Sequence, residues 1–188
     1  YENLLEYGAE HIVFATGSHW DTTGMSAILH DHIGGADASL PSIVTPEQYM
    51  VEGKKVGKRV VVIDNEGYYM GSAMAIELAQ KCHEVTYINY SETVGPYLRL
   101  TLEEQRVYMQ LMELGVKIVS SHMVVAAVKG KVTAMHLYSG EETEYDYDTV
   151  MLVTHRISDC ELYDQMLANP REMEEAGIKS IHLIGDAH

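Results

Sequence analysis

The sequence has few cysteines, few basic residues and no long apolar run, and each shortage excludes a class of protein. The two cysteines, Cys82 and Cys160, form no CxxC pair, which argues against a disulfide scaffold and favours a reducing, cytoplasmic setting. Lysine and arginine total 13 against 28 acidic residues, so nucleic acid and anionic membrane surfaces are unsuitable partners. No apolar run approaches the length of a membrane span, and no signal segment opens the chain.

Apolar residues make up 46% of the 188, enough for a core of one domain, or of one small domain plus pieces of another. The chain lacks an initiator methionine, begins inside what looks like a helix-to-strand unit and stops directly after a predicted strand. We therefore expect both ends to be cuts within a larger protein.

The centre of the chain predicts a parallel βαβ unit. Residues 59–63 form an apolar, β-branched strand, residues 71–81 have helical spacing, and residues 85–88 form a second strand. Capping boxes at residues 45–48 and 101–104 predict two further helix starts.

The remaining segments predict the rest of an α/β fold. Residues 122–153 alternate and predict an antiparallel meander, and residues 161–176 predict helical fragments. Two predicted buried strands, residues 11–15 and 180–184, belong together but flank the central unit, and residues 17–44 are mostly loop. This arrangement is typical of one domain inserted into another.

The fold class is therefore α/β, with a Rossmann-like three-layer βαβ domain and a β-meander over residues 45–155. Residues 1–44 and 156–188 supply the flanking strands of a second nucleotide-binding domain.

The predicted strand-to-helix turn departs from the dinucleotide fingerprint GxGxxG. If Gly71 is the third glycine, the first two places hold Glu66 and Tyr68, a negative charge and a bulky ring where pyrophosphate would approach. Asn89 stands where an acidic residue would bind the ribose, although Glu92 lies three residues beyond. The residues favour an intact nucleotide-binding-type fold that does not use NAD(P).

A filled turn is the expected consequence. Tyr68 or Tyr69 should occupy the volume that a pyrophosphate would take beside Gly71. A carboxylate from Asp64 or Glu66 should cap the helix in place of the phosphate, because the N–H groups there are unsatisfied.

Three other groups of residues are better explained without chemistry. His30, Asp31 and His32 have metal-ligand side chains, but a surface loop is the preferred interpretation and no metal site is expected. Residues 18–21 include the serine, histidine and aspartate of a catalytic triad, but a triad is an arrangement in space and adjacency in sequence is no evidence for it. The acidic, tyrosine-rich residues 141–148 favour a solvated hairpin over a docking surface.

Several motifs resemble one family. Residues 13–18, VFATGS, and residues 180–187, SIHLIGDA, resemble the ATG and closing Gly-Asp strands of two-dinucleotide-fold flavoproteins. The stretches GADASLP, TPEQ and VTHR at residues 35–41, 45–48 and 153–156 resemble the trimethylamine and dimethylamine dehydrogenase family of iron–sulfur flavoproteins, in its C-terminal FAD/NAD(P)-reductase-like region. The resemblance extends over essentially the whole chain.

The resemblance implies a parent enzyme that oxidatively demethylates or deaminates a small amine and passes electrons to an electron-transferring flavoprotein. FMN and a 4Fe–4S cluster would lie in the parent, a homodimer, but outside this chain, so no catalytic residue is assigned here. ADP would replace FAD, with residues 1–44 and 156–188 as its domain, and NAD(P) is not expected.

Five residues are the candidate ADP contacts that the resemblance implies. Ala15, Thr16, Gly17 and Trp20 would line one side of the pocket, and Asp186 would approach from the other strand. The chain alone should be inactive and bind ADP weakly or not at all.

Two alternatives stay open. The chain could be the NAD(P)H-binding domain of a flavin or iron–sulfur reductase of the dienoyl-CoA reductase type, with an unusual turn. It could also be a module for docking an electron-transfer partner or for dimerisation, which only its acidity supports.

Overall fold

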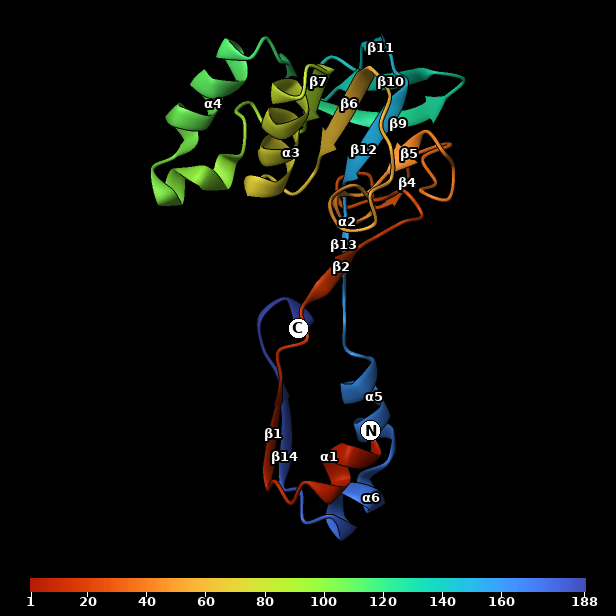
Figure 1. Ribbon diagram of the computed structural model, residues 1–188, viewed down its shortest axis with the longest axis vertical. Coiled ribbons are helices and arrows are strands. Elements are labelled where there is room, and N and C mark those ends of the chain that lie inside the picture. Colours follow the sequence, from red (N-terminus) through yellow and green to blue (C-terminus); the bar gives the residue numbers. More distant parts are fainter. The chain divides into compact units, whose positions relative to one another are not determined.

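The computed structural model describes residues 1–188, whose contacts divide them into two units. The larger unit is Trp20–His155, and the smaller combines Tyr1–His19 with Arg156–His188. Figure 1 labels the elements of both. The mixed α/β fold, with a parallel sheet and antiparallel strands, agrees with the sequence prediction.

A parallel sheet of five strands forms the centre of the larger unit, in the order β5-β12-β6-β7-β8 (Figure 1). The strands are β5 (Ile43–Val44), β12 (Thr149–Val153), β6 (Arg59–Asp64), β7 (Glu84–Asn89) and β8 (Lys117–Val119). Every residue of β12 is buried, and so is every residue of β6 except Arg59. Such continuous apolar runs are typical of parallel strands covered on both faces.

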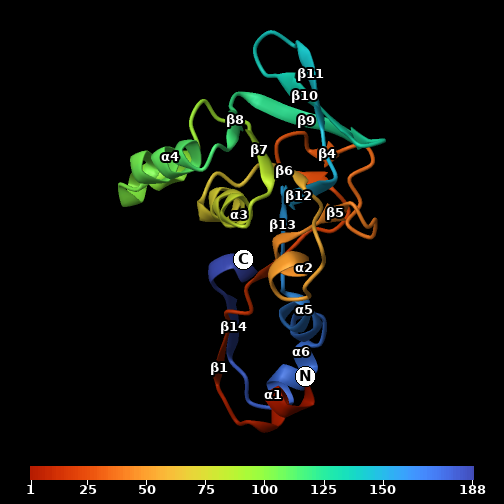
Figure 2. The ribbon, with the colours of Figure 1, turned by 45° about the horizontal axis from the view of Figure 1, so that its top comes forward.

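Different layers cover the two faces of this sheet (Figure 2). Val60 and Val62 of β6 pack toward α3 (Tyr69–Gln80) and α4 (Glu104–Glu113). Val61 and Ile63 pack toward the antiparallel sheet. That sheet consists of β9 (His122–Val128), β10 (Lys131–His136) and β11 (Glu142–Asp146). The alternation follows from the two-residue period of a strand.

Most of the predicted elements are confirmed, and so is the first capping box. Helix α2 (Pro46–Met50) begins after Thr45, whose hydroxyl accepts a hydrogen bond from the Gln48 N–H (3.2 Å). The Gln48 side-chain oxygen in turn accepts from the Thr45 N–H (3.3 Å). This reciprocal pair satisfies two backbone donors at the helix start.

The second capping box, at residues 101–104, is wrong. Thr101 instead ends a 3₁₀ helix, η1 (Pro96–Thr101), and its hydroxyl donates to the Leu98 carbonyl. Leu102 then adopts a left-handed backbone conformation, and α4 begins at Glu104 without a side-chain cap.

The predicted meander is correct for β9 to β11 and wrong for β12. Instead of joining the antiparallel sheet, β12 lies between β5 and β6 and runs parallel to both. Its five consecutive buried residues need cover on both faces, which only the central position in the parallel sheet supplies.

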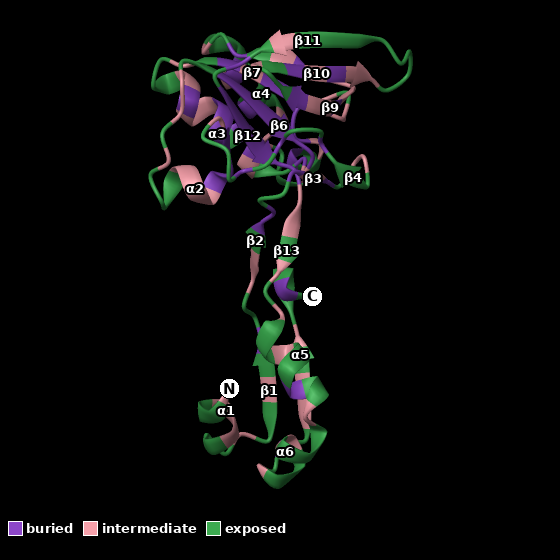
Figure 3. Cartoon of the chain, turned by 90° about the vertical axis from the view of Figure 1, so that its right-hand side faces the viewer, coloured by how far each residue is buried: buried purple, intermediate pink, exposed green.

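The smaller unit pairs β1 (His11–Phe14) with β14 (Ser180–Leu183) in parallel. Phe14, Met166 and Ile178 form its buried core, with α1 (Glu2–Glu6), α5 (Glu161–Ala168) and α6 (Pro170–Glu175) as its helices. The expectation that β1 is buried is wrong, because Val13 is 54% exposed and only Phe14 of the strand is buried. Figure 3 shows β1 largely in the exposed and intermediate colours.

The remaining elements are short. They are β2 (Ser18–Trp20), β3 (Met25–Ser26), β4 (Asp31–His32), β13 (Arg156–Ser158) and η2 (Gly185–Ala187). None of the helices combines the length and the apolar character that crossing a membrane requires.

Candidate functional site

The turn between β6 and α3 lies at the carboxyl edge of the parallel sheet, where α/β proteins commonly bind ligands. Asp64 ends β6 with its side chain fully buried. One carboxyl oxygen accepts hydrogen bonds from the N–H groups of Glu66 and Gly67, each at 2.9 Å. The other accepts from the buried hydroxyl of Tyr87.

The Asp64 carboxyl group also fills the space over the first turn of α3. A Cβ atom added at Gly71 would lie 2.3 Å from Asp64 Cγ and 2.4 Å from its Oδ2. No side chain larger than hydrogen fits there unless Asp64 moves. The turn therefore carries its own carboxyl group in contact with the glycine.

The expectation that Tyr68 or Tyr69 fills the volume beside Gly71 is wrong. The Tyr68 ring instead stacks on Tyr97 of η1, with ring centroids 4.5 Å apart and planes 15° apart. The Tyr69 hydroxyl lies 2.8 Å from the hydroxyl of Thr101, the last residue of η1. It also donates a hydrogen bond to the carboxylate of Glu103. Both rings turn toward η1 because it offers them partners.

The expected cap from Asp64 is not formed. Helix α3 has Tyr68 at its N-cap, and the Tyr68 side chain makes no capping hydrogen bond. Asp64 does not cap the helix and instead stabilises the preceding turn through the Glu66 and Gly67 N–H groups. A cap from Glu66 stays a prediction.

The segment after β7 closes over this turn. Gly67 has a φ of +75°, and a Cβ atom added to it would lie 3.1 Å from the Pro96 ring and 3.1 Å from the Tyr90 hydroxyl. The Tyr97 N–H donates to the Gly67 carbonyl at 3.2 Å. The turn is thus covered by the chain's own residues.

Burial controls the electrostatics of the site. It raises the pKa of Asp64 to about 6, although the hydrogen bonds from Gly67, Tyr87 and Glu66 act in the opposite direction. Burial and the neighbouring Asp64 carboxylate raise the pKa of Tyr87 well above 10, so its phenol remains a donor at neutral pH.

The end of β7 carries an amide where a ribose-binding acid would stand. Asn89 is 1% exposed, and its side-chain N–H donates to the Thr93 carbonyl at 2.6 Å. Glu92, the alternative acid, is exposed and lies 3.5 Å from the Tyr138 hydroxyl. The buried amide of Asn89 is therefore engaged with the chain's own backbone.

Four of the five predicted ADP contacts lie in the smaller unit, at one edge of its sheet. Ala15, Thr16 and Gly17 follow the carboxyl end of β1, and Asp186 follows that of β14. The two strands are parallel neighbours, so these residues share an edge. Gly17 has a φ of +80°, and a Cβ atom added to it would meet nothing within 4 Å, which leaves its backbone open to approach.

Trp20 belongs instead to the larger unit. Its side chain is 3% exposed and packs in the core beside α3, and its backbone N–H donates to a carboxylate oxygen of Glu47 at 3.3 Å. The indole therefore packs in the interior, and contact with a nucleotide stays a prediction.

Sequence reasoning missed Arg156. One of its guanidinium nitrogens lies 3.8 Å from the Asp186 carboxylate, and its side chain is 35% exposed. The signal was available, because Arg156 is the basic residue that directly follows the VTH stretch.

No group of three or more His, Cys, Asp or Glu side chains is placed to hold a metal ion. A 4Fe–4S cluster requires four ligands, usually cysteine thiolates. Cys82 and Cys160 are both free and belong to different units. The residues of this chain therefore do not fit such a cluster.

Comparison with known proteins gives consistent matches. Residues 44–156 match the family described as OYE-like second alpha/beta domain, close to the predicted central domain of residues 45–155. The chain is 37% identical to dimethylamine dehydrogenase from Hyphomicrobium sp. (strain x) over 205 aligned residues, covering 99% of the chain and 28% of that protein.

Two solved structures are similar over nearly the whole chain. Histamine dehydrogenase from Rhizobium sp. 4-9 is 34% identical with a TM-score of 0.90, covering 99% of this chain and 27% of that one. The 6-hydroxypseudooxynicotine amine oxidase from Pseudomonas geniculata N1 is 30% identical with a TM-score of 0.86 and the same coverage. The chain thus spans little more than a quarter of the length of these relatives.

Proposed function

Because this chain belongs to the trimethylamine and dimethylamine dehydrogenase family and carries its OYE-like second α/β domain, we propose that it is a structural, ADP-holding module of an amine dehydrogenase. We propose further that the larger unit is a Rossmann-like domain whose NAD(P) site has been lost.

The observation that carries the loss of the NAD(P) site is the buried Asp64 carboxyl in contact with Gly71. This carboxyl group already accepts the hydrogen bonds of the turn's N–H groups, which a pyrophosphate would need as donors. Its negative charge also repels a phosphate. Glu66 adds a second acidic side chain in the turn. A carboxylate can accept hydrogen bonds from both ribose hydroxyls, whereas the amide of Asn89 has only one acceptor oxygen. The closed turn is stable without a ligand.

ADP binding is proposed for the edge formed by β1 and β14. Gly17 allows a close approach of backbone to ligand, and Thr16 and Asp186 add polar groups at the same edge. Arg156, beside Asp186, supplies a guanidinium group, which suits a phosphate oxygen. These residues form one side of the site.

The activity proposed for the parent enzyme is oxidative demethylation or deamination of a small amine, with electrons passed to an electron-transferring flavoprotein. FMN and a 4Fe–4S cluster would supply the redox chemistry from outside this chain. The parent is proposed to be a homodimer. This chain's proposed contribution is structural and includes binding the ADP.

Nucleotide release from the whole enzyme tests the proposal. Denaturing the purified enzyme and separating the released nucleotides by chromatography should yield ADP, in addition to any flavin bound elsewhere. Gly17→Val, which adds bulk at a positive φ, and Asp186→Asn should lower the ADP content. Lys129→Gln, in a β-turn of the larger unit, is the matched control. Release of FAD or NAD(P) in place of ADP would contradict the proposal.

A further inference from the structure

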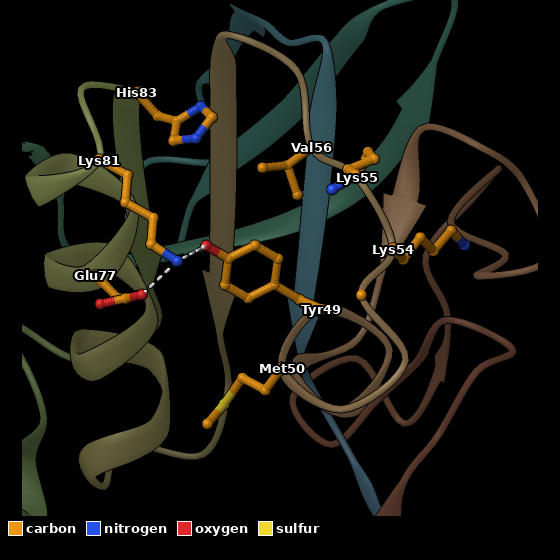
Figure 4. A pocket seen from close by; sticks show the side chains of 9 residues that line it. Tyr49, Met50, Lys54, Lys55, Val56, Glu77, Lys81 and His83 are labelled. Carbon is orange, nitrogen blue, oxygen red and sulfur yellow. Dashed lines mark hydrogen bonds and ion pairs between the residues drawn. The ribbon is translucent and has the colours of Figure 1, made fainter.

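A cavity of about 490 Å³ lies between α2, α3 and the segment of residues 51–58 (Figure 4). Val56 and His83, in its wall, precede β6 and β7, so the cavity lies at the amino edge of the parallel sheet. The closed turn at Asp64 lies at the opposite edge. The volume is within the range of small-molecule sites.

The charge of the cavity is opposite to that of the chain. Three lysines and a single glutamate line it, whereas the whole chain has a net charge of −15. Lys54 is structural, because its ammonium donates to the carbonyls of Ala38 (2.6 Å) and Ile43 (2.7 Å). Lys55 and Lys81 are the two lysines that remain to meet a ligand.

Lys55 differs from most basic residues of this chain, since its ammonium has no acidic partner. Four other lysines pair with carboxylates, namely Lys58, Lys81, Lys131 and Lys179, whereas Lys117 and Lys129 share the unpaired state of Lys55 but do not line the cavity. A cation left unpaired among 28 acidic residues, at the mouth of a cavity, is placed to attract an anion.

Lys81 has one donor left for a ligand. Its ammonium bonds to the Glu77 carboxylate at 2.6 Å and to the Tyr49 hydroxyl at 3.2 Å, as Figure 4 shows. An ammonium group has three N–H donors, so the third remains available. The two contacts fix the position of the ammonium, which reduces the entropy lost on binding.

The cavity also has an apolar surface. Tyr49 and Val56 are partly buried and pack against the core, and Met50, beside them, is 60% exposed. His83 completes the wall, held by a 2.7 Å hydrogen bond from its Nδ1 to the Gly57 carbonyl. An apolar group of a ligand can lie against Tyr49 and Val56 while its charge faces the lysines.

From these contacts, we propose that the cavity binds a small organic anion, a carboxylate or a phosphate monoester, whose apolar body lies against Tyr49 and Val56. Lys55 and Lys81 bind the anionic group. The proposal is independent of the ADP-holding role and of the closed turn.

Titrations of the full chain followed by amide NMR shifts test this proposal. The probes are phenyl phosphate and benzoate, which share a ring and differ in their anionic group, inorganic phosphate, which lacks the ring, and benzylamine, which reverses the charge. At least one aromatic anion should produce saturable shifts at residues 49–56 and 77–83. Benzylamine should produce none, and inorganic phosphate should bind at least about fivefold more weakly than phenyl phosphate, because it buries no ring.

Variants separate the cavity from general surface charge. Lys55→Gln and Lys81→Gln should each weaken binding by about tenfold, the effect of losing a charged hydrogen bond. Lys129→Gln removes the same charge far from the cavity lining and should leave binding unchanged. The proposal is overturned if no aromatic anion saturates, if inorganic phosphate binds as tightly as phenyl phosphate, or if Lys129→Gln weakens binding as much as Lys55→Gln does.

Discussion

Replacement of Asp64 by asparagine should stabilise the protein, and more so at higher pH. The buried carboxyl has its pKa raised from 3.8 to about 6, so the folded state binds a proton more tightly than the unfolded state does. Its contribution to stability is complete below pH 3.8 and is lost as the pH rises through about 6. Above that pH the folded protein holds a buried carboxylate.

The size of the effect follows from the pKa shift. About two pKa units correspond to about 3 kcal/mol between pH 4 and pH 8. Asparagine in place of Asp64 would keep the geometry, because an amide oxygen can still accept from the Glu66 and Gly67 N–H groups. Its NH₂ group can donate to the Tyr87 oxygen, so little except the charge is lost.

Urea unfolding of both proteins, followed by circular dichroism from pH 4 to pH 8, measures this effect. The free energy of unfolding of Asp64→Asn minus that of the wild type should rise by about 3 kcal/mol across the range. Asp148→Asn is the control of opposite sign, because a hydrogen bond from Arg59 lowers the pKa of Asp148 to about 2. That variant should be less stable than wild type by a nearly constant amount from pH 4 to pH 8, and the difference should disappear when its series is extended toward pH 2. A difference for Asp64→Asn that does not change with pH would refute the reasoning.

Three further predictions test the turn and the surface charge. Gly71→Ala places a Cβ 2.3 Å from Asp64 Cγ and should cost about 1–3 kcal/mol in urea unfolding. Gly34→Ala, where the nearest atom would be 3.5 Å away, is its control, and equal losses would contradict the account. The double variant Glu66→Gly, Tyr68→Gly removes the stack of Tyr68 on Tyr97 and raises the backbone entropy of the unfolded chain. Its free energy of unfolding should be lower than that of the wild type by about 1 kcal/mol or more, and NADH binding should not be restored. The parent enzyme's association rate with an electron-transferring flavoprotein should fall about tenfold or more as salt is raised, if the acidic surface attracts a basic partner, and a rate indifferent to salt would remove that argument.

Local patterns made much of the central fold predictable. The apolar β-branched run of β6 and the helical spacing of α3 are signals within a few residues, and the box at Thr45 is a pattern of four. β12 shows the limit, because a short apolar run does not say which sheet it joins. Its parallel position depends on partners about 90 to 110 residues away in sequence, which no local pattern encodes.

The contents of the turn could be predicted only in part. The missing glycines and the acids were visible in the sequence, and Gly71 packs closely against Asp64 at the end of β6. The sequence did not reveal which group lies beside Gly71, because Asp64 is held there by Tyr87, a partner 23 residues away. Tyr68 and Tyr69 contact η1 instead. The sequence did not predict that 3₁₀ helix, because residues 101–104 have the pattern of a capping box.

Calorimetric titration of the full chain with NADH and NADPH at neutral pH tests the central claim most directly. The account predicts no saturable heat at millimolar nucleotide and no rise in melting temperature, because Asp64 already occupies the turn and is charged at that pH. Saturable binding of either nucleotide, with a matching rise in melting temperature, would contradict it and favour a reductase of the dienoyl-CoA reductase type.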